Sequence, residues 1–184
     1  MKPLQQLDLR EVALQFQEKL KKIKIALFDV DGIMTDSRVF WSGEEVGYNR
    51  FFNTQDGYGL KVLKRAGLKV GIITGGSSVG VKNRFSDLGV DFLYMGNEDK
   101  REAWKDILDI TGALEEEILY MGDEFFDLPL LKRAGFSATA PHASIEIRQC
   151  VDYVSHRQGG DGCVREVIDL VRHAQSITPD VGEL

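Results

Sequence analysis

Short apolar runs alternate with longer amphipathic stretches along most of the chain. The apolar runs cover residues 25–30, 70–74, 92–95, 118–121 and 136–140. Each run leads into a polar loop, and continuous apolar runs are typical of strands buried on both faces. The stretches with helical spacing cover residues 57–66, 79–88, 100–110 and 128–134. This alternation predicts an α/β fold, a doubly wound, Rossmann-like parallel sheet with helices on both of its faces.

Two segments depart from this rhythm. Apolar residues recur at helical spacing over 9–20, which predicts an amphipathic helix ahead of the first strand. Residues 38–53 contain two apolar arms around a glycine-bearing turn, a pattern that predicts an inserted β-hairpin. We therefore expect an N-terminal helical extension over 1–22, one domain over 23–175 with the hairpin as a flap, and a flexible tail over 176–184.

Composition narrows the class of partner. The 184 residues are 43% hydrophobic and 28% charged, which suits one globular domain. The net charge of -6, without a basic stripe, argues against nucleic acid, so an anionic ligand has to be held by a metal ion, a lysine or backbone N–H groups. Neither a signal peptide nor a membrane-spanning run is visible, and Cys150 and Cys163 are too few for a disulfide framework. We expect a cytoplasmic chain with no membrane partner.

The first strand ends in a pair of carboxylates, Asp29 and Asp31, followed by Gly32. In an open α/β sheet, ligands bind at the carboxyl ends of the strands. Two carboxylates so close together repel each other unless a cation or a proton intervenes. By itself the pair is explained equally well by an acidic turn.

Three further strand ends carry polar groups. Thr74 and Gly75 open a small-residue loop before a helix, which suits a phosphoryl oxygen but also an ordinary helix cap. Lys100 opens a helix after the next strand, where a solvated surface lysine is the plain alternative. Asp123 and Asp127 lie in an acidic loop that could equally be an N-cap or a calcium-like turn.

Taken together and in this order, the four features resemble the haloacid dehalogenase superfamily over residues 24–175. The resemblance implies that Asp29 is the nucleophile and Asp31 the acid and base. It implies that Thr74 binds a phosphoryl oxygen, that Lys100 neutralises charge and that Asp123 completes a Mg²⁺ site.

The chemistry agrees with these roles. A carboxylate nucleophile splits one difficult displacement into two easier steps through an aspartyl-phosphate. Mg²⁺ prefers oxygen ligands and lets two anions approach each other. We expect it to be held by the side chains of Asp29 and Asp123 and the backbone carbonyl of Asp31. The resemblance also implies that Asp127 orients Lys100 or a metal-bound water.

The space between Asp36 and Thr74 holds only the hairpin and one helix, so no cap domain is encoded. Capless members that the chain resembles include the 3-deoxy-D-manno-octulosonate 8-phosphate (KDO 8-phosphate) phosphatases. The likeness extends to residues 53–59, 159–162 and 164–167. It implies a small sugar-acid phosphate as substrate and adds the supporting residues Gly75, Asp56, Gly57 and Arg165. The plain alternatives are an N-cap and turn at Asp56 and Gly57, and a salt-bridged helix face that carries Arg165 and Glu166.

The resemblance also implies a homotetramer, in which the hairpin and the C-terminal glycine loop of neighbouring subunits close the site. By the same resemblance Phe40, Trp41 and Phe52 of the hairpin pack at a subunit interface. Aromatic hairpin residues that simply join the core are the alternative.

Two departures from the family pattern keep the substrate open. Gly76 stands where the family commonly has an arginine, and Glu124 stands where it commonly has an aspartate. A related nonulosonate 9-phosphate or another sugar phosphate is therefore an alternative substrate. The neighbouring Phe125 and Phe126 are expected to pack against the sheet or a neighbour. The three histidines, His142, His156 and His173, receive no role.

Three other functions share part of this pattern. A receiver-type signalling module places its acidic pair and its acceptor on different strands, which disagrees with Asp29 and Asp31 on one strand. A catalytically impaired assembly or binding protein is suggested by Gly76 and Glu124, although every residue for the two chemical steps is present. A phosphotransferase would need a cap to exclude water.

Overall fold

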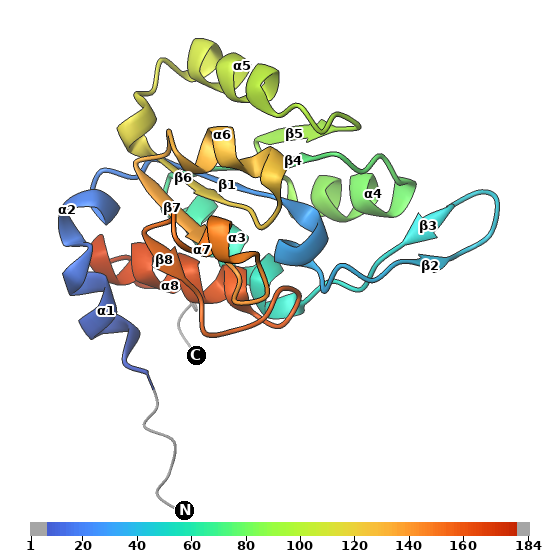
Figure 1. Ribbon diagram of the computed structural model, residues 1–184. Helices are drawn as coiled ribbons and strands as arrows, with labels where there is room; N and C mark the ends of the chain where they lie inside the picture. The colour runs from blue at the N-terminus through green and yellow to red at the C-terminus, as the bar shows by residue number, and fades with distance from the viewer. Residues whose placement is uncertain (1–6, 180–184) are drawn as a thin grey trace, which may run out of the picture.

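The computed structural model describes residues 7–179. The strands of its central sheet are β1 (Ile25–Phe28), β4 (Lys69–Thr74), β5 (Phe92–Met95), β6 (Ile118–Met121), β7 (Phe136–Thr139) and β8 (Tyr153–Val154). They lie in the order β5-β4-β1-β6-β7-β8, and every pairing is parallel (Figure 1). Five of these strands are predicted by the apolar runs, whereas β8 is too short to give such a run.

Helices cover both faces of the sheet (Figure 1). They are α1 (Leu9–Gln15), α2 (Gln17–Leu20), α3 (Thr54–Arg65), α4 (Val79–Leu88), α5 (Arg101–Thr111), α6 (Leu128–Leu131), α7 (Ile145–Arg148) and α8 (Cys163–Ala174). Successive residues of β1 face opposite cores, because side chains alternate along a strand. Ala26 and Phe28 pack with α1, α3, α4 and α8, while Ile25 and Leu27 pack with α5 and α6. The predicted doubly wound sheet is confirmed.

Several element boundaries differ from the prediction. Helix α3 begins at Thr54 rather than at residue 57, because the side chain of Asn53 caps it by accepting from the Gln55 N–H at 2.8 Å. The suggested N-cap at Asp56 is therefore wrong. Helix α6 ends at Leu131 rather than at residue 134.

The predicted hairpin is present as β2 (Phe40–Trp41) and β3 (Tyr48–Asn49), which pair antiparallel and project from the sheet (Figure 1). It is preceded by a one-turn segment, Val30–Met34, and followed directly by α3, so residues 30–65 contain no cap domain. Phe52 packs edge-on against Phe85 of the core, with ring centroids 5.6 Å apart. Phe40 and Trp41, by contrast, are exposed.

The two ends of the described chain pack together. Helix α1 lies against α8 and contributes Val12 and Ala13 to the core. The side-chain amide of Gln175 donates to the carbonyls of Leu20 and Ile23 at 2.9 and 2.7 Å. Ile177, at the start of the expected tail, also packs on the core, while residues 1–6 and 180–184 lie outside the described part. Within residues 7–179, no helix has the length and apolar character needed to span a bilayer.

Candidate active site

The turn after β1 places Asp29 at the carboxyl end of the sheet. The Asp29 N–H donates to the Met121 carbonyl at 2.9 Å, which extends the β1–β6 ladder up to this residue. Gly32 has φ +90°, and a Cβ there would overlap the carboxylate of Asp123. A glycine is therefore needed both for the left-handed backbone and for the close approach of the acidic loop.

Lys100 is the cation of the site and not a surface lysine. Its side chain is fully buried, with Nζ 2.8 Å from Asp29 Oδ1 and 2.6 Å from Asp127 Oδ1. Nζ also lies 3.2 Å from the Tyr120 hydroxyl and 4.7 Å from the centroid of the Phe126 ring, over the face of that ring. Burial works to lower the pKa of Lys100, but the carboxylates of Asp29 and Asp127 outweigh it and raise that pKa above its ordinary value.

Burial has the opposite consequence for Asp29. It raises the pKa of this carboxyl, and the positive charge of Lys100 opposes the rise. The nearby Asp127 adds to the rise by repulsion. A further cation beside Asp29 would therefore favour the ionised carboxylate.

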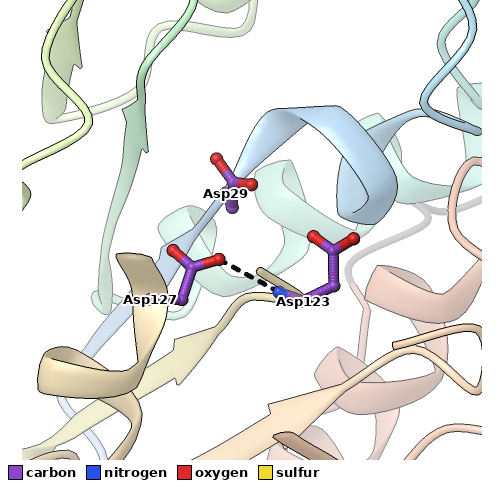
Figure 2. A group of neighbouring side chains, drawn as sticks. All are labelled: Asp29, Asp123 and Asp127. Atoms are coloured by element: carbon purple, nitrogen blue, oxygen red, sulfur yellow. Dashed lines mark hydrogen bonds between the residues drawn. The ribbon is translucent and has the colours of Figure 1, made fainter. Parts of the chain in front are cut away.

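Asp29, Asp123 and Asp127 form one acidic cluster, shown in Figure 2. One ligand oxygen of each lies within 4.8 Å of the others. Asp127 Oδ2 accepts from the backbone N–H groups of Asp123 and Glu124 at 3.1 and 3.0 Å, while its Oδ1 holds Lys100. Asp127 thus fixes both the acidic loop and the lysine.

The donors of this cluster fit a hard divalent cation such as Mg²⁺. Asp123 Oδ1 is buried, and no group in residues 7–179 donates a hydrogen bond to it. A buried carboxylate oxygen without a partner is costly unless a cation binds it. The side chains of Asp29 and Asp123 are therefore suited to hold the ion, with the Asp31 carbonyl expected from the sequence as a further ligand.

Glu124 turns away from this cluster. Its side chain is exposed and caps its own turn by accepting from the Phe125 N–H at 2.8 Å. The exchange of aspartate for glutamate therefore leaves the acidic cluster intact. Phe125 is exposed as well, so only Phe126 of the aromatic pair packs inside.

Thr74 lies at the end of β4, beside β1, and is buried. Its Oγ1 accepts from the Gly76 N–H at 3.1 Å. A Cβ placed on Gly76 would lie 3.5 Å from both Thr74 Oγ1 and Asp31 Oδ2. Thr74, Gly75 and Asp31 therefore share one edge of the site, as the strand-end rule predicts.

Two residues at the site were missed by sequence reasoning. Arg50, directly after β3, donates Nε and Nη2 to the two carboxylate oxygens of Asp31, the second bond measuring 2.9 Å. His142, in the loop after β7, has Nε2 3.0 Å from Asp123 Oδ2, and this bond raises the pKa of the histidine. Each lies alone in an irregular segment, so no spacing signal marks it.

The other supporting residues are not brought to the acidic cluster. Asp56 is buried in α3 and accepts from the Arg165 N–H at 2.7 Å. The Arg165 side chain pairs with Asp169, four residues further along α8, at 3.1 Å, so Arg165 lies on a salt-bridged helix face, as the plain alternative predicts. Gly57 lies where a Cβ would overlap the guanidinium of Arg84. These residues join α3 to its neighbouring helices.

Glu166 holds the segment that leads into the C-terminal glycine loop at residues 159–162. Its buried carboxylate accepts from the Tyr153 hydroxyl at 2.7 Å and the His156 N–H at 2.8 Å. The loop lies directly on the turn after Asp29, because a Cβ on Gly159 would overlap the carbonyl of Gly32. The loop thus supports the active-site turn within one chain.

Burial of Asp56 predicts a pH-dependent stability. Burial raises the pKa of Asp56 to about 6, so between pH 4 and 6 the folded chain binds more protons than the unfolded chain and stability falls as pH rises. Asp56→Asn keeps the side-chain oxygen that accepts from the Arg165 N–H, but it has no proton to lose, so its stability does not fall over this pH range. Relative to the parent chain, the free energy of unfolding of Asp56→Asn in urea should therefore improve by about 2 kcal/mol from pH 4.5 to pH 7.

The matched control is Asp36→Asn. The Arg38 side chain holds the pKa of Asp36 below its usual range, so this carboxyl stays ionised at both pH values. Its effect on stability should be the same at pH 4.5 and pH 7. An Asp56→Asn effect that is equally flat would contradict the account of Asp56.

Comparison with known proteins decides the family. No family model matches the chain. KDO 8-phosphate phosphatase KdsC from Salmonella typhi is 34% identical over 166 residues, which cover 89% of this chain and 87% of the relative. The chain belongs to the KDO 8-phosphate phosphatase family. Its resemblance to the haloacid dehalogenase superfamily is thereby confirmed.

Solved structures of this family share the fold. The phosphatase from Moraxella catarrhalis, crystallised with magnesium, phosphate and KDO, superposes with a TM-score of 0.83 at 35% identity, covering 88% of this chain and 92% of that one. The cobalt-bound phosphatase from Haemophilus influenzae gives a TM-score of 0.81 at 32% identity, with 86% and 92% coverage. The capless α/β architecture is therefore that of the KDO 8-phosphate phosphatase family.

Proposed function

We propose that the chain is a Mg²⁺-dependent phosphatase that hydrolyses KDO 8-phosphate to KDO and phosphate. The observation that carries this proposal is Asp29 buried against Lys100, with Asp123 and Asp127 beside it at the ends of β1 and β6. A buried carboxylate next to a fixed lysine and an oxygen-rich cluster suits attack on a phosphoryl group.

The reaction takes two displacements at phosphorus. Asp29 attacks the phosphorus atom, the bond from phosphorus to the sugar oxygen breaks, and Asp31 gives its proton to that leaving oxygen. Asp31 then takes a proton from a water molecule that attacks the aspartyl-phosphate. The bond between phosphorus and the Asp29 oxygen breaks, which releases phosphate and restores the carboxylate.

The remaining groups stabilise charge during both steps. Lys100, held in place by Asp127, neutralises the nucleophile and the phosphoryl oxygens, and Thr74 donates its hydroxyl to one of these oxygens. Asp29, Asp123 and the Asp31 carbonyl would hold Mg²⁺. When bound, Mg²⁺ reduces the repulsion between the Asp29 carboxylate and the anionic substrate.

The substrate is supported by the relatives. Proteins about one third identical over most of their length are KDO 8-phosphate phosphatases, and the Moraxella catarrhalis structure contains both expected products together with magnesium. The match with the Salmonella typhi phosphatase covers 89% of this chain.

The test is phosphate release from a panel of substrates, with Mg²⁺ and with EDTA. The panel contains KDO 8-phosphate, a nonulosonate 9-phosphate and a neutral hexose 6-phosphate. Mg²⁺-dependent release with the highest kcat/KM for KDO 8-phosphate is expected. Preference for another member would overturn the substrate, and no release from any member would favour an assembly or binding protein.

The proposed enzyme acts as a homotetramer in the cytoplasm. The hairpin carries exposed aromatic residues, with Trp41 59% and Phe51 70% exposed. Clustered apolar surface on a projecting element is typical of a subunit interface. Both cysteines, Cys150 and Cys163, are free thiols, which agrees with a reducing compartment.

The tetramer is tested by the molar mass in light scattering. Trp41→Ser together with Phe51→Ser should lower the mass from that of four chains toward that of one or two, because the hairpin loses its apolar surface. Ile110→Ser, at a residue of α5 that is 69% exposed, is the matched control and should leave the mass unchanged. A hairpin variant with the parent mass would place the interface elsewhere.

A further inference from the structure

Arg50 is a fixed and largely desolvated cation at the mouth of the site. Its side chain is 9% exposed, although it comes from the projecting hairpin. Nε and Nη2 donate to the two oxygens of Asp31, and Nη1 donates to Ser78 Oγ at 3.1 Å. Three donors of one guanidinium are thus engaged, so the orientation of its planar fork is set before any ligand binds.

The loop after β4 makes room for this arginine. A Cβ on Gly76 would lie 3.0 Å from Arg50 Nη2, tighter than an ordinary contact. A Cβ on Gly80, at the start of α4, would overlap the side chain of Asn49. The hairpin arm with Asn49 and Arg50 therefore fits against α4 because glycine occupies both positions.

The guanidinium also faces the groups that handle the substrate. The space above Gly76 is bordered by Arg50, Thr74 and Asp31 together. The Asp31 carboxylate that the fork holds is 35% exposed, so a ligand from solvent can reach it. Lys100, by contrast, is buried and already held by Asp29 and Asp127. Arg50 thus places positive charge beside Thr74 and Asp31, in addition to the charge that Lys100 places beside Asp29.

We propose that Arg50 is a substrate-binding residue whose guanidinium fork binds the phosphoryl oxygens of the sugar phosphate. This inference rests on the proposed function. The Asp31 carboxylate, which holds two parallel donors of the fork, marks where a phosphoryl group with two matching oxygens binds. Substrate oxygens compete with Asp31 for the guanidinium, and Asp31 is then turned toward the leaving oxygen.

The first test measures binding at the phosphoryl position alone. In Arg50→Ala, the inhibition constant of inorganic phosphate and the KM for both KDO 8-phosphate and p-nitrophenyl phosphate should rise by about 10- to 100-fold. Arg38→Ala is the matched control, since Arg38 lies at the base of the same hairpin and pairs with Asp36 only at the surface. It should stay within about twofold of the parent chain for each constant.

A phosphate inhibition constant within about twofold of the parent value in Arg50→Ala would overturn the proposal, since one charge-assisted hydrogen bond already exceeds that change. A loss confined to KDO 8-phosphate would also overturn it, because the arginine would then bind the sugar-acid carboxylate. Arg50→Lys covers the case in which the alanine variant does not fold. It keeps the charge without the fork, and its phosphate inhibition constant should rise severalfold.

The second test moves the guanidinium. Gly76→Arg in the parent chain should lower kcat/KM, because its Cβ crowds Arg50 and adds a second cation to the same space. In the Arg50→Ala background the same substitution should raise kcat/KM, since it returns a guanidinium to the emptied space. A merely structural role of Arg50 predicts no such reversal, and the same sign in both backgrounds would contradict the proposal.

These outcomes are separable from failure of the proposed function. If the parent chain releases phosphate from p-nitrophenyl phosphate but not from KDO 8-phosphate, the substrate proposal fails. In that case the phosphate inhibition constants of the parent chain and of the Arg50 variants still measure binding at the phosphoryl position.

Discussion

Asp29→Asn is expected to lower phosphate release by about four orders of magnitude or more, the scale seen when a covalent nucleophile is removed. An amide cannot form the acyl-phosphate, and the neighbouring Asp127 cannot replace Asp29, because it is held by Lys100 and by its own loop. The measurement is single-turnover release of phosphate from KDO 8-phosphate at saturating Mg²⁺.

The loss should come without unfolding. Burial raises the pKa of Asp29, so the charged carboxylate is not what stabilises the fold, and Lys100 keeps Asp127 as a partner in the variant. The melting temperature of Asp29→Asn should equal or exceed that of the parent chain. Asp87→Asn, at an exposed carboxylate on α4, is the control for charge and should keep full activity. Activity above about one per cent in Asp29→Asn would contradict nucleophilic catalysis by this residue.

Lys100→Met should give the second large effect, on activity and stability together. The kcat is expected to fall by about 10²- to 10³-fold, as when a preorganised charge-stabilising donor is removed. The free energy of unfolding should fall by about 3–5 kcal/mol, because Asp29 and Asp127 remain buried without their cation. The free energy of unfolding is measured without added metal, and kcat is measured with Mg²⁺.

A double variant separates the two effects. Lys100→Met with Asp127→Asn removes one of the unpaired carboxylates and should recover a large part of the lost stability, but none of the activity. Lys105→Met, at an exposed lysine on the same helix, is the matched control and should change neither. A Lys100→Met chain as stable as the parent would show that the buried charges are not coupled as the distances indicate.

The sheet and most of the site could be predicted from the sequence because both follow from strands buried on two faces. Such strands leave continuous apolar runs, and parallel strands bring their carboxyl ends to one edge. Asp29, Thr74, Lys100 and Asp123 each follow one of these runs, so their positions come from the order of the elements alone. For Asp127 the family resemblance left Lys100 or a metal-bound water open as its partner, and the structure places it 2.6 Å from Lys100.

Contacts between irregular segments could not be predicted. Arg50 reaches Asp31 because the hairpin arm lies against Gly76 and Gly80, and no periodic pattern encodes that approach. His142 reaches Asp123 across a loop after β7 for the same reason. Strand β8 was missed because its two residues give no pattern, although parallel pairing with β7 fixes it in the sheet.

The central claim is that the Asp29 carboxylate becomes phosphorylated, and trapping of that acyl-phosphate tests it most directly. The chain is mixed with KDO 8-phosphate and Mg²⁺, quenched within one turnover, reduced with borohydride and mapped by peptide mass spectrometry. Reduction of an aspartyl-phosphate converts that aspartate to homoserine, which the account predicts at position 29 and at no other aspartate. Homoserine at position 31 or 123 instead, or none while phosphate is being released, would contradict it.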